Sequence, residues 1–78
     1  MSVNKRIVSY HIGRLQDKSP EVRLKAIQEL ALLGETEALE ALQSVFKNDP
    51  DVDVRKAAQE AGRQIFVKQQ EQEQKEQK

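Results

Sequence analysis

Two acid–arginine pairs with the same spacing are the charged groups of this chain best placed for specific chemistry. Asp17 and Arg23 recur as Asp49 and Arg55, each 32 positions later. A guanidinium can hold a carboxylate through two parallel hydrogen bonds, so each pair could form a fixed contact across a turn. Because the pairs repeat with a single period, we interpret all four residues as structural contacts that tie loops to helices from layer to layer. Catalysis is not expected of them.

The other reactive side chains do not form a catalytic or metal-binding set. His11 is the only histidine and there is no cysteine, so multi-histidine and thiolate metal sites are excluded. Ser9 lies two residues from His11, which would place the two side chains on different faces of a helix. The chain also lacks a glycine-rich phosphate loop. We therefore expect no catalytic residue, no metal, no cofactor and no enzymatic activity.

Composition favours one small domain built from amphipathic helices. Apolar residues make up 37% of the 78 residues and charged residues 33%, so a core must be assembled from narrow stripes. The polar sequence of residues 68–78, KQQEQEQKEQK, has no apolar side chain to bury. We expect a single domain over residues 1–67, followed by a tail that is frayed, disordered or a solvated helical extension.

Charge is balanced overall but unevenly distributed. The chain has 13 basic and 13 acidic residues, so nothing drives it as a whole toward nucleic acid or an anionic membrane. Residues 1–16 contain no acid, whereas residues 35–53 contain six acids and only Lys47 as a base. We expect another protein of mixed charge as the partner. Without a signal peptide, a long apolar run or cysteine, a cytoplasmic location is expected.

Apolar periodicity and capping residues predict the first two helices. Residues 3–16 place Val8, Ile12 and Leu15 on one face, with Ile7 widening the stripe. Residues 20–33 are better specified, because Ser19 is a preferred N-cap, Pro20 suits the first helical position and Gly34 can end the helix in the left-handed conformation. The stripe of this second helix comprises Val22, Ala26, Ile27, Leu30 and Leu33.

Two further helices are expected after short connections. The third begins with Gly34 or Thr36 as its cap and ends near Asn48, antiparallel to the second helix. Its inward residues are expected to be Ala38, Leu39, Leu42, Val45 and Phe46. For the fourth, Asp51 is a better-placed cap than Asp49, and the core stripe is Val54, Ala58, Ala61 and Ile65, with Phe66 beside it.

The repeat of 32 residues explains the duplicated acid–arginine phrase. Val22 and Ala26 also recur, as Val54 and Ala58. Only at the position of Leu30 does the residue type change, to Gly62. A period in the thirties combined with helical hairpins is typical of α-solenoids, in which each hairpin packs on the next. We predict an all-α fold, a short α-α solenoid fragment of about four antiparallel helices in two layers.

Residues 17–34 resemble the HEAT-like repeats named after phycobilisome lyases, in which a phrase like D-x-x-P-x-V-R-x-x-A-x-x-x-L-x-x-x-G recurs. The resemblance extends over roughly residues 5–66, although only one complete hairpin is present. It implies that the second and fourth helices are outer and the first and third line an inner face. Di-iron enzymes with similar repeats use His-Glu pairs, whereas His11 is followed by Ile12.

The resemblance implies a protein-binding scaffold, with an accessory role in phycobilisome or bilin-lyase assembly or degradation as the alternative. Six polar residues of the first and third helices are the candidate protein-binding face: Tyr10, His11, Arg14, Glu40, Gln43 and Lys47. A homodimer through Phe66 and Val67 of the fourth helix is a further expectation. In the competing account these two residues fold back over Ile65 and the protein is a monomer.

Overall fold

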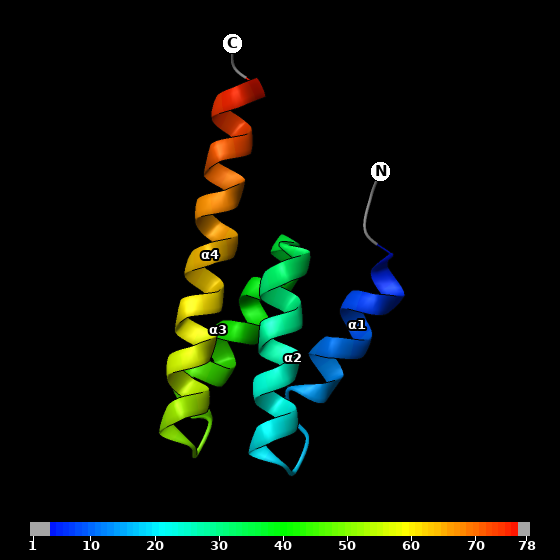
Figure 1. Ribbon diagram of the computed structural model, residues 1–78, viewed down its shortest axis with the longest axis vertical. Helices are drawn as coiled ribbons and strands as arrows, with labels where there is room; N and C mark the ends of the chain where they lie inside the picture. The colour runs from blue at the N-terminus through cyan, green and yellow to red at the C-terminus, as the bar shows by residue number, and fades with distance from the viewer. Residues whose placement is uncertain (1–3, 77–78) are drawn as a thin grey trace.

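The computed structural model describes residues 4–76, with side chains as far as residue 71, and this part of the chain is all-α. Its elements are α1 (Lys5–Arg14), α2 (Pro20–Leu33), the 3-10 helix η1 (Thr36–Ala38), α3 (Leu39–Asn48) and α4 (Val52–Glu76). Each α-helix runs antiparallel to the next (Figure 1). The predicted all-α solenoid fragment is confirmed.

The four helices form two layers. The helices α2 and α4 lie side by side and point the same way, with α3 behind them and α1 at the outer edge of α2 (Figure 1). Eleven buried apolar side chains fill the space between the layers: Val8, Leu15, Ala26, Ile27, Leu30, Ala38, Leu42, Val54, Ala58, Ala61 and Ile65. Every helix contributes to this core, so the solenoid layers are held by one continuous apolar cluster.

Helix α1 is shorter than expected and touches the core along a narrower stripe. It starts after Asn4, whose side chain accepts a hydrogen bond from the Arg6 N–H (2.8 Å), while residue 3 lies outside the described residues. Val8 and Leu15 are buried as predicted. Ile7 was expected to widen the stripe, but it is 45% exposed because it lies on the flank of α1 turned away from the core.

Helix α2 has the predicted bounds and caps. The Ser19 hydroxyl oxygen accepts from the Val22 N–H (3.4 Å) and the Ser19 hydroxyl donates to Glu21 Oε1 (2.9 Å). Gly34 ends the helix at φ 69°, in the left-handed region that glycine adopts without steric cost, and its N–H donates to the Leu30 carbonyl. The hydrogen bond from Ser19, followed by that from the Glu21 backbone N–H, lowers the pKa of Glu21 below its ordinary value.

Ser19→Ala is expected to lower the free energy of unfolding by about 1 kcal/mol, because the N-cap acceptor is lost. The pKa of Glu21 should rise toward its ordinary value, since the largest cause of its depression is removed. A carboxyl group with a depressed pKa in the folded state stabilises the fold at pH values above its ordinary pKa, and this stabilisation is lost as the pH falls through the depressed pKa. The variant should therefore lose less stability on acidification than the wild type. Urea unfolding and NMR titration of Glu21 measure both effects. Ser44→Ala, at an exposed serine, serves as the matched control.

The connection from α2 to α3 passes through η1, and α3 ends at Asn48 as predicted. Leu42 and Ala38 are buried, and Leu39 and Val45 are half-buried. Phe46 was expected to face inward, but it is 40% exposed. Phe46 and Gly62 line the same depression between α3 and α4. Gly62 stands where the first repeat has Leu30, so no side chain from that position covers Phe46.

Helix α4 begins at the predicted cap but does not stop where α2 does. Asp51 Oδ1 accepts from the N–H groups of Asp53 (2.8 Å) and Val54 (3.2 Å). Phe66 stands at the repeat position of Gly34, so the residue that would end the helix is absent and α4 continues to Glu76, beyond the end of α2 (Figure 1). The division into a domain of residues 1–67 and a tail of residues 68–78 stays a prediction.

No helix in residues 4–76 has both the length and the apolar character that a membrane crossing requires.

Candidate binding groove

Among residues 4–71 the two buried charged side chains, Arg23 and Asp49, form a pair between successive repeats. Arg23 Nε lies 2.8 Å from Asp49 Oδ2, and Arg23 Nη2 donates to Asp49 Oδ1 (3.2 Å). Their side chains are only 11% and 5% exposed. The Nε–H is not aligned with an acceptor, so the contact at that atom is an ion pair rather than a hydrogen bond. This pair joins α2 to the loop that precedes α4.

Within each repeat the arginine binds the backbone of the aspartate rather than its carboxylate. Arg23 Nη1 donates to the carbonyl of Asp17 (2.7 Å), and Arg55 Nη1 donates to the carbonyl of Asp49 (2.6 Å). The two carboxylates instead accept from backbone N–H groups two residues ahead, at Ser19 and Asp51. The carboxylate fork expected within each repeat is therefore replaced by a backbone contact, and the carboxylate pairing runs from one repeat to the next.

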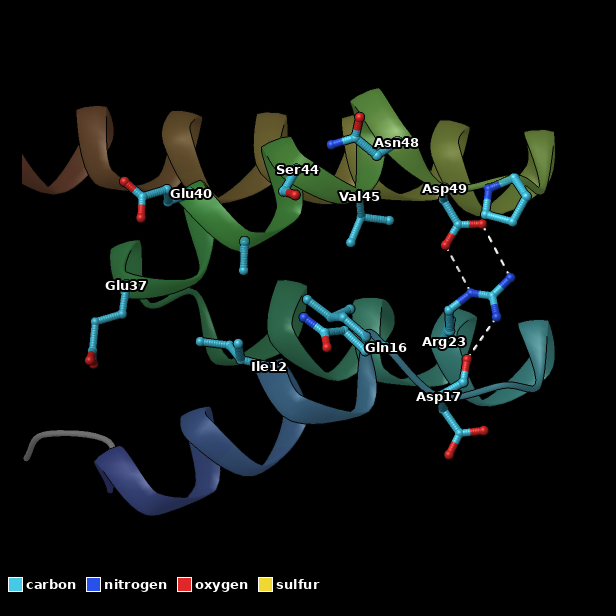
Figure 2. A pocket seen from close by; sticks show the side chains of 13 residues that line it. Ile12, Gln16, Asp17, Arg23, Glu37, Glu40, Ser44, Val45, Asn48 and Asp49 are labelled. Carbon is cyan, nitrogen blue, oxygen red and sulfur yellow. Dashed lines mark hydrogen bonds and ion pairs between the residues drawn. The ribbon is translucent and has the colours of Figure 1, made fainter.

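A groove of about 650 Å³ lies between α1 and α3, in front of the layer of α2 and α4 (Figure 2). Its apolar lining is provided by Ile12, Leu15, Ala41, Val45 and Pro50. Its neutral polar lining is provided by Gln16, Ser44 and Asn48. The groove exists because α1 packs on α2 through Val8 and Leu15 and leaves the adjacent face of α3 uncovered.

The charged lining of the groove is mainly acidic. Four carboxylates contribute to it, from Asp17, Glu37, Glu40 and Asp49, together with the single guanidinium of Arg23. Glu37 and Glu40 lie at one end, and the Arg23–Asp49 pair lies at the other (Figure 2). Arg23, the single base of the lining, is already engaged by Asp49 and by two backbone carbonyls at the other end. The lining therefore offers no base that could neutralise Glu37 and Glu40.

The candidate residues of α1 gather into a separate cluster. The Arg14 guanidinium lies 5.5 Å from the centre of the Tyr10 ring, and His11 meets that ring edge-on with centroids 5.1 Å apart. Arg14 Nη1 is 3.5 Å from His11 Nδ1. Tyr10 is 63% exposed. None of the three lines the groove among the described residues, because they lie on the flank of α1 opposite Ile12 and Gln16.

The candidate residues of α3 are divided between surfaces. Glu40 lines the groove, whereas Gln43 lines a shallow depression between α3 and α4. Lys47 is exposed and lines neither surface in the described part of the chain. The six predicted residues thus do not form one continuous face. Binding by any of them stays a prediction.

Sequence reasoning did not select the central groove residues Ile12, Gln16, Ser44 and Asn48 for binding. Ile12 was assigned to the core, and no binding role was expected of the other three. One signal was present: Ser44 and Asn48 stand four residues apart on α3, the spacing that places side chains on the same helix face. What the spacing could not reveal is that α1 leaves this face open.

A family model of HEAT repeats matches residues 3–63. The chain belongs to the HEAT repeat family. The match covers α1, α2 and α3 and most of the part of α4 that packs on the core. HEAT repeats commonly serve as protein-interaction scaffolds and are generally non-catalytic. Comparison with curated proteins and with solved structures gives no match.

Residues 4–71 of this HEAT repeat protein bring together no group of three side chains that could hold a metal ion. The acids of the groove are spread along it, with Asp49 neutralised by Arg23. The groove is thus apolar in the middle and acidic at the Glu37 and Glu40 end, with the Arg23–Asp49 ion pair at the other end.

The residues of the expected homodimer contact are both exposed, Phe66 at 53% and Val67 at 48%. They therefore do not fold back over Ile65 as the competing account expected. At about 100° per residue they point in different directions. Phe66 lies on the same helix face as Gln59 and Gly62, and Val67 lines a polar depression with Lys68. Homodimerisation through α4 stays a prediction.

Phe66→Glu is expected to abolish any association through this face of α4 and to change the free energy of unfolding by less than about 0.5 kcal/mol, because the ring is exposed. Sedimentation over a wide concentration range measures the association. Leu32→Glu, at an exposed apolar residue of α2, is the matched control. A wild-type protein that stays monomeric throughout contradicts the dimer.

Proposed function

We propose that this HEAT repeat protein is a non-catalytic interaction module that binds another protein in the groove between α1 and α3. The observation that supports the proposal is the groove itself, an apolar concavity of about 650 Å³ with a polar rim. Its lining comes from separate parts of the chain held by the core and by the Arg23–Asp49 pair, so the surface is preorganised for binding.

The α1 cluster of Tyr10, His11 and Arg14 is the rival binding surface. An exposed tyrosine stacked by arginine has the composition of a binding hot spot. It is a convex patch on one helix, whereas the groove is concave and draws on three helices. The concave surface can enclose more of a partner, and we therefore assign binding to the groove.

Ser44→Trp tests the assignment, because Ser44 is exposed and lines the middle of the groove, where an indole would fill the space without disturbing the core. Immobilised protein should retain its partner in the wild type and lose more than about 90% of it in the variant, a tenfold or larger loss of affinity. Gln28→Trp, at an exposed site of α2 outside the groove, should retain the partner.

Tyr10→Ala separates the two surfaces. Retention of the partner by Tyr10→Ala and its loss in Ser44→Trp support the groove. The reverse pattern assigns binding to the α1 cluster and contradicts the proposal. Circular dichroism and urea unfolding of each variant confirm that the fold is intact before binding is compared.

A narrower proposal concerns the phycobilisome-lyase branch of the family. It rests on the phrase in residues 17–34, and it makes the protein an accessory factor in phycobilisome or bilin-lyase assembly or degradation. Phycobiliprotein subunits and free bilin are the probes, in a pull-down and an absorbance titration. The absence of binding to both contradicts this narrower role and leaves the general interaction role standing.

A further inference from the structure

The lining of the groove defines the chemistry of what can occupy it. Along α3 the groove extends from Glu40 to Asn48, a distance of about 12 Å at the helical rise per residue. Ile12, Ala41 and Val45 form its apolar middle, and their side chains can only gain from contact with other apolar groups. An occupant must therefore present apolar side chains over about two helical turns.

The acidic end of the groove sets the charge of the occupant. Glu37 of η1 and Glu40 in the first turn of α3 place two like charges at the same end of the groove (Figure 2). Both are exposed, and neither has an ion-pair partner within residues 4–71. An occupant that brings a cation between them relieves their repulsion, whereas an anionic occupant adds to it.

The opposite end offers no free positive charge that would attract an acid. Arg23 is held on three sides, by the carboxylate of Asp49 and by the carbonyls of Asp17 and Lys18. Breaking these contacts to bind an external acid would leave Asp49 buried without its partner, which is costly. The groove is therefore complementary to basic groups at one end and has no site for acidic groups at the other (Figure 2).

The backbone conformation of the occupant follows from the polar groups available. An extended segment needs hydrogen-bond partners for its backbone, and the groove has no strand edge and only three neutral polar side chains, Gln16, Ser44 and Asn48. A helix satisfies its own backbone and can lay an apolar stripe between α1 and α3.

We propose that the occupant of the groove is a short amphipathic helix of another protein, with an apolar stripe at i, i+3, i+4 and i+7 and lysine or arginine at the end that meets Glu37 and Glu40. This inference rests on the proposed function of the groove and names its ligand class. The basic, partly apolar outer flank of α1 in a second copy has similar chemistry, so self-association is an outcome that the test must separate.

Two labelled peptides of about twenty residues, above the length of roughly 12–15 residues at which isolated helices are marginal, are the probes. Both carry leucine at the stripe positions. The first has lysine at the polar positions and the second has glutamate. Fluorescence anisotropy should show the lysine peptide binding at least tenfold more tightly than the glutamate peptide, and more weakly as salt is added.

Glu37→Gln/Glu40→Gln should weaken binding of the lysine peptide about tenfold, the effect of two exposed charge contacts. Glu60→Gln/Glu71→Gln removes the same charge from an exposed face of α4 outside the groove and should change the affinity less than about twofold. Equal affinity for the two peptides, equal losses in the two double variants, or no binding of either peptide overturns the inference.

The failure of the inference is distinguishable from the failure of the proposed function. If Ser44→Trp blocks a captured partner but the two glutamate substitutions do not weaken it, the groove binds proteins and the basic helix is the wrong ligand. If Ser44→Trp has no effect on the partner, the proposed function fails. Sedimentation of the protein alone completes the test: self-association that Glu37→Gln/Glu40→Gln abolishes identifies a second copy as the occupant and overturns the assignment to another protein.

Discussion

Asp49→Ala is expected to lower the free energy of unfolding by about 3 kcal/mol, because it leaves the buried guanidinium of Arg23 without its carboxylate. The substitution also removes the acceptor for the Asp51 N–H, at the turn that begins α4. A small domain has a total stability of roughly 5–15 kcal/mol, so the loss is a large fraction of it. Urea unfolding followed by circular dichroism measures the change.

Asp17→Ala is the matched control, since Asp17 occupies the same repeat position. Its carboxylate accepts only from the Ser19 N–H in an exposed turn, so its loss is expected to cost less than about 1 kcal/mol. Similar losses in the two variants would show that the pair between repeats adds nothing beyond the turn. Adding Arg23→Met to Asp49→Ala should recover part of the loss, because it removes the unpaired charge.

The comparison of Asp17 with Asp49 illustrates how much of the fold a repeat can predict. The 32-residue offset correctly indicated two equivalent turns, and in both the arginine and the aspartate hold the same local contacts. The offset could not indicate that Asp49 alone also meets an arginine from the preceding repeat. That contact depends on how repeats stack, and within the described residues the Asp17 carboxylate forms no ion pair with an arginine.

The core was predictable because local periodicity and tertiary packing agree. Val54, Ala58, Ala61 and Ile65 are all buried, and Ser19, Gly34 and Asp51 cap the helices as their chemistry predicts. The prediction that Phe46 faces inward was wrong, because periodicity identifies an apolar position but does not show whether other side chains pack over it. Gly62 and Gln59 stand where α2 has Leu30 and Ile27, so the layer that would bury Phe46 is missing.

The candidate site was less predictable than the core. Tyr10, His11 and Arg14 do meet, as their spacing of one helical turn allows. The groove depends instead on the orientation of α1 relative to α3. That orientation is set by the contacts of α1 with α2. No pattern within a single helix encodes it. A groove formed between two helices that make few contacts with each other could therefore be found only from the three-dimensional arrangement.

Leu15→Ala is expected to lower the free energy of unfolding by about 3 kcal/mol and to release α1 before the remaining helices unfold. Leu15, the C-cap residue of α1, is 4% exposed, and with Val8 it makes up the fully buried apolar contact of this segment with the core. The equivalent truncation at Leu32, which is 76% exposed on α2, should cost less than about 0.5 kcal/mol. Urea unfolding compares the two leucines directly.

Hydrogen exchange then shows which helix is destabilised by the Leu15→Ala substitution. In Leu15→Ala the amides of α1 should lose protection, while those of α2, α3 and the buried half of α4 keep theirs, because their core residues are untouched. Ile12 and Leu15 form the α1 wall of the groove, so the same variant should lose binding of the lysine peptide although the Glu37 and Glu40 charges remain. Full peptide binding by Leu15→Ala with α1 unprotected would contradict the groove, since recognition would then need only the exposed face of α3.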